Sequence, residues 1–190
     1  MMVIRIVLIA SLAWARLAAQ MPAGHTVPSG TVREGTLSFD GRATTGGFTG
    51  TTTTVSGELQ GGEWTEIRGW VEAPVRTLAT GNERRDRDLN KSMESGRYPV
   101  LRFELTGVTG PGSAGDSVGV ELHGRFIIHG VTREATLPAT VVLHAAGVGV
   151  RGETTLNLKE YGIKGLTKML GMLKMDEEIL VHIDLLFAPS

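Results

Sequence analysis

The feature that most constrains this 190-residue chain is a pair of alternating apolar runs on either side of a short polar break. The positions that share one face are Gly124, Phe126 and Ile128 in the first run and Ala135, Leu137, Ala139, Val141 and Leu143 in the second. Side chains of a strand point to opposite faces with a period of two, so each run has one apolar face. The break, His129–Arg133, contains Gly130, which tolerates a tight reversal. The pattern predicts an antiparallel hairpin, and Pro138 disfavours a helix.

The same period of two recurs along most of the chain. We count eight alternating segments, at 36–43, 48–59, 67–75, 101–106, 118–128, 135–143, 148–158 and 179–187. Short connections join nearly all of them, and 26 glycines supply frequent turns. One apolar face on every strand predicts a single closed interior. The expected fold is all-β, an eight-stranded antiparallel barrel with one or two short helices, while a two-sheet sandwich would give the same local pattern.

The expected interior positions hold many very small residues. They are Gly41, Gly57, Gly69, Gly124, Gly152, Ala135 and Ala139. An under-filled barrel of this size has room for one small ligand or lipid chain. Alternatively, these glycines mark bends where strands curve strongly. The pattern favours a cavity but leaves both interpretations open.

Residues 80–97 interrupt the alternation with a dense run of charges. Leu89 and Met93 are four positions apart, and this spacing predicts one or two helical turns on the surface. Arg85 and Asp86 lie within the run. Arg85 has two interpretations: a polar clamp at the barrel mouth that binds a phosphate or carboxylate head group, or a structural ion pair with Asp86.

A second exception is the segment from Gly165 to Met175. Its apolar residues at helical spacing, starting from Ile163, are Leu166, Met169, Leu170 and Leu173, with Met172 beside them. The spacing predicts a helix. Such a helix has three interpretations: a cap that packs on the open core, a Met-rich lid over variable apolar ligands, or a membrane-surface contact flanked by lysines.

The N-terminus has the layout of a secretory signal peptide. One arginine precedes an apolar run, and the small residues Ala18 and Ala19 follow it. This layout predicts cleavage near Ala19 or Gln20, with an uncleaved anchor or a misassigned start codon as alternatives, and the apolar run is too short to span a membrane comfortably. The expected organisation is therefore a signal peptide at 1–20, a lead-in segment at 21–35 and the barrel domain at 36–190, in a periplasmic or secreted protein.

Composition excludes several kinds of chemistry. A formal net charge of −1 gives no electrostatic basis for nucleic-acid binding. The absence of cysteine excludes disulfides and thiolate-ligated metals. The five histidines lack the spacing of a zinc motif, so we expect solvated surface histidines, His129 among them, and neither metal nor cofactor. No motif indicates a catalytic residue, and we expect no enzymatic activity.

Three segments in order resemble the YceI-like family. The first, 82–105, contains Arg85-Asp86, Leu89 and Tyr98-Pro99; the second is 124–137, and the third is 159–163. The resemblance covers the chain from about Thr36 to its C-terminus. It implies an extracytoplasmic, lipocalin-like barrel that binds a polyisoprenoid or another long amphiphilic chain in an apolar tunnel.

Together these features predict non-enzymatic binding or transport of a long-chain apolar ligand, isoprenoid-like or fatty-acid-like. The expected lining is Phe39, Val71, Leu101, Phe103, Phe126, Ile128, Leu137, Val141, Leu156 and Ile183, with Arg85 at the mouth and Leu166, Met169, Leu170, Met172 and Leu173 on the lid. Two alternatives are a packed structural or stress-related accessory barrel and an enzyme that acts on lipid head groups. Transient membrane contact fits the lysine-flanked segment, and the oligomeric state stays open, a homodimer included.

Overall fold

The computed structural model of the chain describes residues 26–44, 46–110, 113–114, 117–163, 167–168 and 173–189. The predicted signal peptide at 1–20 lies outside the described residues. In chain order the elements are β1 (Gly30–Ala43), β2 (Gly46–Thr52), β3 (Ser56–Gln60), β4 (Arg68–Pro74), η1 (Val75–Thr77), α1 (Glu83–Ser92), β5 (Val100–Thr109), β6 (Ser113–Ala114), β7 (Ser117–Ile128), β8 (Val131–His144), β9 (Gly147–Asn157), η2 (Leu158–Tyr161), β10 (Thr167–Lys168), β11 (Leu173–Lys174) and β12 (Glu178–Ala188).

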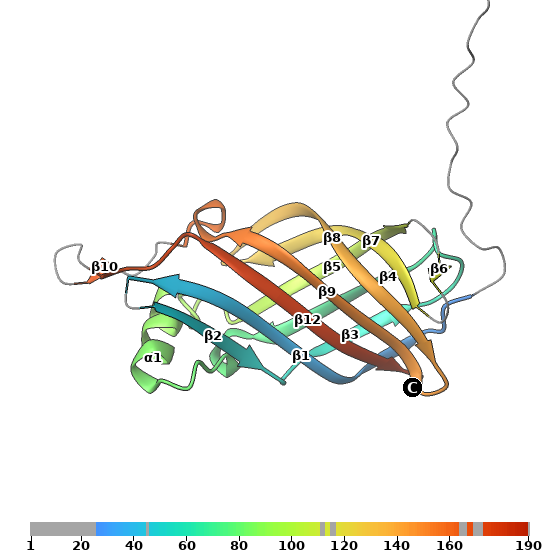
Figure 1. Cartoon of the computed structure of the whole chain (residues 1–190), viewed down its shortest axis with the longest axis horizontal. Coiled ribbons are helices and arrows are strands. Elements are labelled where there is room, and N and C mark those ends of the chain that lie inside the picture. The colour runs from blue at the N-terminus through green and yellow to red at the C-terminus, as the bar shows by residue number, and fades with distance from the viewer. Residues whose placement is uncertain are drawn as a thin grey trace, which may run out of the picture.

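The described strands form a closed antiparallel barrel of eight strands, which confirms the predicted fold class (Figure 1). The order around the barrel is β1, β12, β9, β8, β7, β5, β4 and β3. Pairing of β1 with both β12 and β3 closes the circle. The sandwich alternative is therefore wrong. Two packed sheets would each have unpaired edge strands, whereas here β1 pairs on both sides and closes the sheet into a barrel.

Strand β1 changes partner along its length. Gly30 and Thr31 pair with β3, whereas Leu37–Ala43 pairs with β2. The predicted strand at 48–59 is thus two strands rather than one. The break follows Thr52, whose hydroxyl accepts a hydrogen bond from the backbone N–H of Thr54 at 3.0 Å, a local bond that competes with a strand ladder. Strand β4 pairs with β3 and not with β2, so β2 and β4 diverge.

Segment 75–82 spans the space between β2 and β4. Thr51 and Ala79 exchange two backbone hydrogen bonds, and the hydroxyls of Thr52 and Thr77 lie 2.7 Å apart. Helix α1 follows at once, which confirms the helix predicted within 80–97. The side chain of Asn82 caps it by accepting the N–H of Arg85 at 3.0 Å. Helix α1 lies at the barrel end where β10 lies, opposite β6 (Figure 1).

The hairpin predicted around Gly130 is confirmed. Strands β7 and β8 pair from Ser117–Val142 to Ile128–Val131, so the turn contains only two residues. His129 has a φ of 54° and Gly130 a φ of 75°. Two left-handed central residues are typical of a type I′ turn, whose twist matches that of the strands. The predicted break at His129–Arg133 was longer than the actual turn.

Two boundary expectations differ from the structure. Strand β1 begins at Gly30, so the end of the predicted lead-in segment at 21–35 belongs to the barrel. The helix expected over 165–175 is wrong where the chain is described, since β10 and β11 pair as antiparallel strands. Glycine disfavours helix by about 1 kcal/mol relative to alanine, and this segment contains two. Leu166, Met169, Leu170 and Met172 lie outside the described residues.

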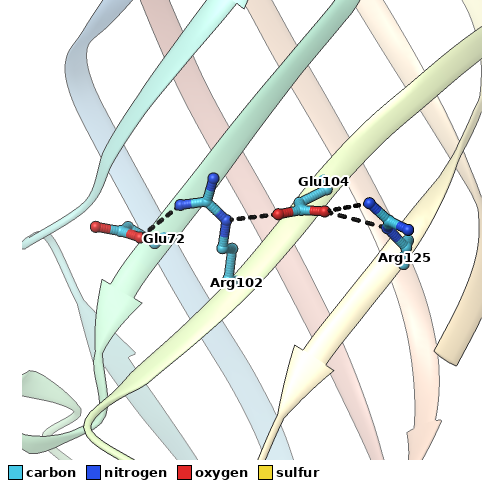
Figure 2. A network of polar contacts seen from close by, with 4 residues as sticks. All are labelled: Glu72, Arg102, Glu104 and Arg125. Atoms are coloured by element: carbon cyan, nitrogen blue, oxygen red, sulfur yellow. Dashed lines mark hydrogen bonds and ion pairs between the residues drawn. The ribbon is translucent and has the colours of Figure 1, made fainter. Parts of the chain in front are cut away.

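A row of alternating charges crosses the outside of the barrel on β4, β5 and β7 (Figure 2). Arg102 donates to Glu72 at 2.9 Å and to Glu104 at 3.1 Å, and Arg125 donates to Glu104 at 2.7 Å. The Arg102 guanidinium also lies 4.5 Å from the centre of the Trp70 ring. The hydrogen bond from Arg125 is the largest cause that lowers the pKa of Glu104 below its ordinary 4.5; burial opposes it and Arg102 adds to it.

We expect Glu104→Gln to lower the free energy of unfolding by about 1 kcal/mol at neutral pH, because a partly exposed ion-pair network is worth little more. The folded-state pKa of Glu104 is lowered, so its stabilisation is present above pH 4.5 and is lost as the pH falls through the folded-state value. Urea unfolding across this pH range should show wild type and variant converging in acid. Glu58→Gln, an exposed β3 glutamate with no ion pair among the described residues, is the control. An equal loss in both variants would contradict this role for the network.

Candidate functional site

The side chains that face the barrel interior differ in burial between its two halves. In the half away from α1 most are buried: Leu59, Val108, Val120, Leu122, Val141, Val148, Val150, Leu185 and Phe187. Toward α1 most are only partly buried, namely Leu37, Val71, Leu101, Phe103, Phe126, Leu156, Ile179 and Ile183, although Phe39, Ile128 and Val181 are buried. An inward side chain of a closed barrel is exposed only to an internal space or to the barrel mouth. The half next to α1 is therefore hollow.

This hollow half contains a cavity of about 180 Å³, lined almost entirely by apolar side chains and partly open to solvent. Two separate apolar clusters lie around it, one centred on Phe39 and Val181, the other on Ile128 and Tyr161. Leu101 packs against both clusters. The side chains of this half thus pack along the wall and leave the axis of the barrel unfilled.

Helix α1 presents one stripe of side chains to the cavity. Arg85, Leu89 and Met93 are spaced by four residues, so they lie on one face of the helix, and all three line the cavity. The Arg85 guanidinium lies 4.5 Å from the centre of the Phe48 ring on β2, a cation–π contact. Arg85 is thus a cationic group at the edge of an apolar space, held by an aromatic ring.

Asp86 has a different role from its neighbour Arg85. Its carboxylate accepts the backbone N–H of Thr80 at 2.9 Å and the Thr80 hydroxyl at 2.6 Å. These bonds fix the segment that enters α1. In the part of the chain that the structure describes, no carboxylate forms an ion pair with the Arg85 guanidinium. The structural pair between Arg85 and Asp86, one of two interpretations of the sequence, is therefore not formed.

The three segments that carry the family resemblance meet at His129. The Tyr98 ring of the first segment packs on the His129 ring with centroids 4.5 Å apart. The His129 Nδ1 atom lies 3.0 Å from the carbonyl oxygen of Tyr161 in the third segment. A carbonyl only accepts, so Nδ1 carries the proton. These contacts fasten the β7–β8 turn to η2 and to the loop that precedes β5, beside the cavity.

The expectation of a solvated His129 is wrong. Its side chain is only 10% exposed, and its Nε2 atom faces the Glu94 carboxylate at 3.5 Å. Sequence spacing identifies turn residues but does not show what packs over them. Glu94 itself has a φ of 44° and closes the turn after α1. The left-handed residues of two loops thus lie together at this end.

Tyr161 adds a polar but uncharged group to the lining. It is 3% exposed, and burial is the largest cause that raises the pKa of its hydroxyl above 10.0. The phenol therefore stays neutral across the physiological range. Ile163 follows Tyr161 and is equally buried. This segment adds uncharged groups to the cavity wall, and Met93 packs against it.

Most of the predicted lining residues lie in the cavity. They are Phe39, Val71, Leu101, Phe103, Phe126, Ile128, Leu137, Leu156, Ile183 and Arg85. Val141 is a correction: it lies deeper along β8 than Leu137, in the packed half, where it lines a smaller cavity. Leu173 belongs to β11. Sequence reasoning missed Phe48, Leu89, Met93 and Tyr161 as lining; the spacing of four from Arg85 pointed to two of these.

The interior glycines do not leave the space that the sequence suggested. A Cβ atom on Gly124 would lie 2.6 Å from Cζ of Phe103 and 2.3 Å from the Glu104 carbonyl oxygen. A Cβ on Gly41 would similarly meet the Phe48 ring at 2.8 Å. Neighbouring rings and backbone thus occupy the glycine positions. The small residues are therefore not the cause of the cavity, whose lining includes Arg85 and Leu89 of α1 and Phe48 of β2.

The fold and its apolar cavity define a lipocalin-like antiparallel barrel. Comparison with protein-family models matches the YceI-like domain over residues 30–187, and the chain therefore belongs to the YceI-like family. A curated relative, the "UPF0312 protein" of Pseudomonas savastanoi pv. phaseolicola, is 30% identical over 105 residues, which are 50% of this chain and 52% of the relative. The chain thus spans about half the length of the curated relatives it matches.

Two solved structures share the fold. A polyisoprenoid-binding domain from Saccharophagus degradans, implicated in plant cell wall breakdown, superposes with a TM-score of 0.68 at 13% identity, covering 86% of this chain and 99% of that one. BcnA of Burkholderia cenocepacia gives a TM-score of 0.67 at 14% identity, covering 80% and 94%. Within the residues that the structure describes, no helix has the length and apolar character needed to cross a membrane.

We expect Gly130→Ala to destabilise the protein by about 1–3 kcal/mol, because an alanine at a φ of 75° is strained and its Cβ would lie 2.5 Å from the Tyr98 ring. Gly119→Ala on β7 is the matched control, since no atom lies within 4 Å of its Cβ. Urea denaturation of both variants gives the comparison. Similar unfolding free energies in the two would contradict a packing role for this turn.

Proposed function

We propose that this protein binds one long-chain apolar or amphiphilic molecule in its barrel, without catalysing a reaction on it. The observation that carries the proposal is the contrast between the packed and the hollow half. Apolar side chains that face an unfilled space forgo contacts that a hydrocarbon chain would supply. A site of this kind, concave and apolar with one cationic group at its edge, suits a chain with a polar head.

Membership of the YceI-like family supports a binding role. The Saccharophagus degradans neighbour is described as polyisoprenoid-binding, so an isoprenoid stands with fatty acids among the ligands to test. Both are single flexible chains with a small head, a shape that suits a cavity of about 180 Å³ with an apolar lining. Membrane contact during loading and a homodimer stay predictions, as does the lid role of residues 165–175.

An extracytoplasmic location belongs to the same proposal. It rests on the charged start, short apolar run and small residues of 1–20. Barrels that carry apolar chains through water are useful where a membrane supplies the chain and an aqueous space must be crossed. The proposed transport role therefore fits the periplasm or the exterior of the cell.

The two alternatives from the sequence are less well supported. A purely structural barrel would gain stability from a filled interior, and one half of this barrel is unfilled. An enzyme would need an acid–base pair near the ligand, and the one carboxylate among the described lining residues, Glu72, forms an ion pair with Arg102 at 2.9 Å. Native mass spectrometry of freshly purified protein separates the three: a retained lipid supports binding, its hydrolysis product supports an enzyme, and a clean apo mass supports a packed role.

We expect Leu156→Trp to reduce retention of the bound chain at least tenfold, because the larger ring fills the cavity that Leu156 lines. Thr155→Trp is the matched control, since the adjacent residue on β9 is exposed and points outward. Fluorescent fatty-acid titration of each variant gives the affinity, and thermal denaturation checks folding. Equal affinity in folded Leu156→Trp and wild type would reject the cavity as the site.

We expect Arg85→Gln to weaken binding of an anionic fatty acid about tenfold, since a charge-assisted hydrogen bond to the carboxylate is lost. Binding of the corresponding fatty alcohol should change by less than about twofold, because it carries no charge for Arg85 to pair. Arg84→Gln, an exposed neighbour on α1 that does not line the cavity, is the control. Equal losses for acid and alcohol would show that Arg85 only supports the packing of Phe48.

A further inference from the structure

The barrel holds a second, smaller cavity of about 60 Å³ deeper along its axis. It lies in the packed half, beyond the end of the larger cavity. Four side chains line both spaces: Val71, Phe103, Ile183 and Leu185. One layer of side chains therefore separates the two cavities. Trp64 and Phe187 are buried and line the smaller cavity.

Phe103 is the largest member of the separating layer. Its ring reaches from β5 across β7, where Gly124 offers no side chain: a Cβ there would lie 2.6 Å from the ring. The Phe126 ring packs beside it at 4.8 Å between centroids. Despite its central position, Phe103 is only partly buried, because one side of the ring faces the larger cavity.

We propose that Phe103 limits the length of chain that the barrel accepts. This inference rests on the proposed binding function and adds the determinant of selectivity among single-chain lipids. Successive inward side chains lie about 6.6 Å apart along a strand, and a strand tilt near 40° makes this roughly 5 Å along the barrel axis. One row from Phe103 to Leu105 thus corresponds to a few carbon atoms of chain.

The thermodynamic consequence is a plateau in affinity. Each methylene group that enters the larger cavity should strengthen binding about fourfold, the ratio that corresponds to burial of one methylene. Once the chain end meets the Phe103 ring, further carbons stay outside or force the chain to bend, and the gain stops. Removing the ring joins the cavities and should move the plateau to longer chains.

The experiment measures dissociation constants for a saturated series, decanoate, laurate, myristate, palmitate, stearate and arachidate, on wild type and on Phe103→Ala. We expect the plateau to move toward longer chains in Phe103→Ala, with a gain of about sixteenfold for the first chain beyond the wild-type limit, because it adds two methylenes at about fourfold each. Phe126→Ala is the matched control: it removes an equal ring that lines only the larger cavity. Its plateau should stay in place even if overall affinity changes.

A second pair of variants tests the smaller cavity directly. Val141 lines it and not the larger one, so Val141→Met should leave wild-type selectivity unchanged and return Phe103→Ala to the wild-type plateau. If Phe103→Ala fails to fold, Phe103→Leu provides the same comparison with a smaller change in volume.

The outcomes separate the two proposals. A plateau that is unchanged in a folded Phe103 variant, or that moves equally in Phe126→Ala, overturns the role of Phe103 while chain binding stands. Wild-type protein that binds no member of the series and carries no isoprenoid overturns the binding function itself.

Discussion

The structure depends on the partner change of β1. On one edge β1 pairs with β12 along nearly its whole length, and on the other it pairs first with β3 and then with β2. Because β3 continues to β4 and β2 does not, the barrel closes tightly at one end and diverges at the other. A diverging end cannot be filled by inward side chains of the strands alone. It is covered by η1 and α1, which are joined to β2 by the Thr51–Ala79 bridge and to the barrel by Leu89.

The open end is also where distant parts of the chain are fastened together. His129, held in a left-handed turn, donates to the carbonyl of Tyr161 and packs on Tyr98. These contacts join the β7–β8 turn, η2 and the loop before β5 into one rim around the cavity. The rim explains why three segments separated in sequence carry the family resemblance together. It is a structural unit whose geometry sets the cavity's boundary, whatever chain the cavity takes.

The sequence predicted the strands well because alternation is a local property of each one. It also identified most of the lining, since inward positions follow from the same alternation. It failed where an outcome depends on packing between segments. Alternation cannot tell that Val141 lines the smaller cavity whereas Leu137 lines the larger one, or show that the Phe103 ring covers Gly124. Helical spacing over 165–175 was misleading because a short apolar run fits more than one period, and pairing between β10 and β11 decided the conformation.

The two halves of the barrel divide stability and binding between them. The packed half supplies a continuous core from Val27 and Trp64 to Leu137, and the outer row of ion pairs braces β4, β5 and β7. The hollow half leaves apolar surface without partners, which costs stability in the empty protein. A ligand chain that fills the hollow half would restore these contacts. It would stabilise the folded state by an amount that grows with the logarithm of the ratio of ligand concentration to dissociation constant. Under the proposed binding function, the cost of the unfilled end contributes to the driving force for uptake of a ligand.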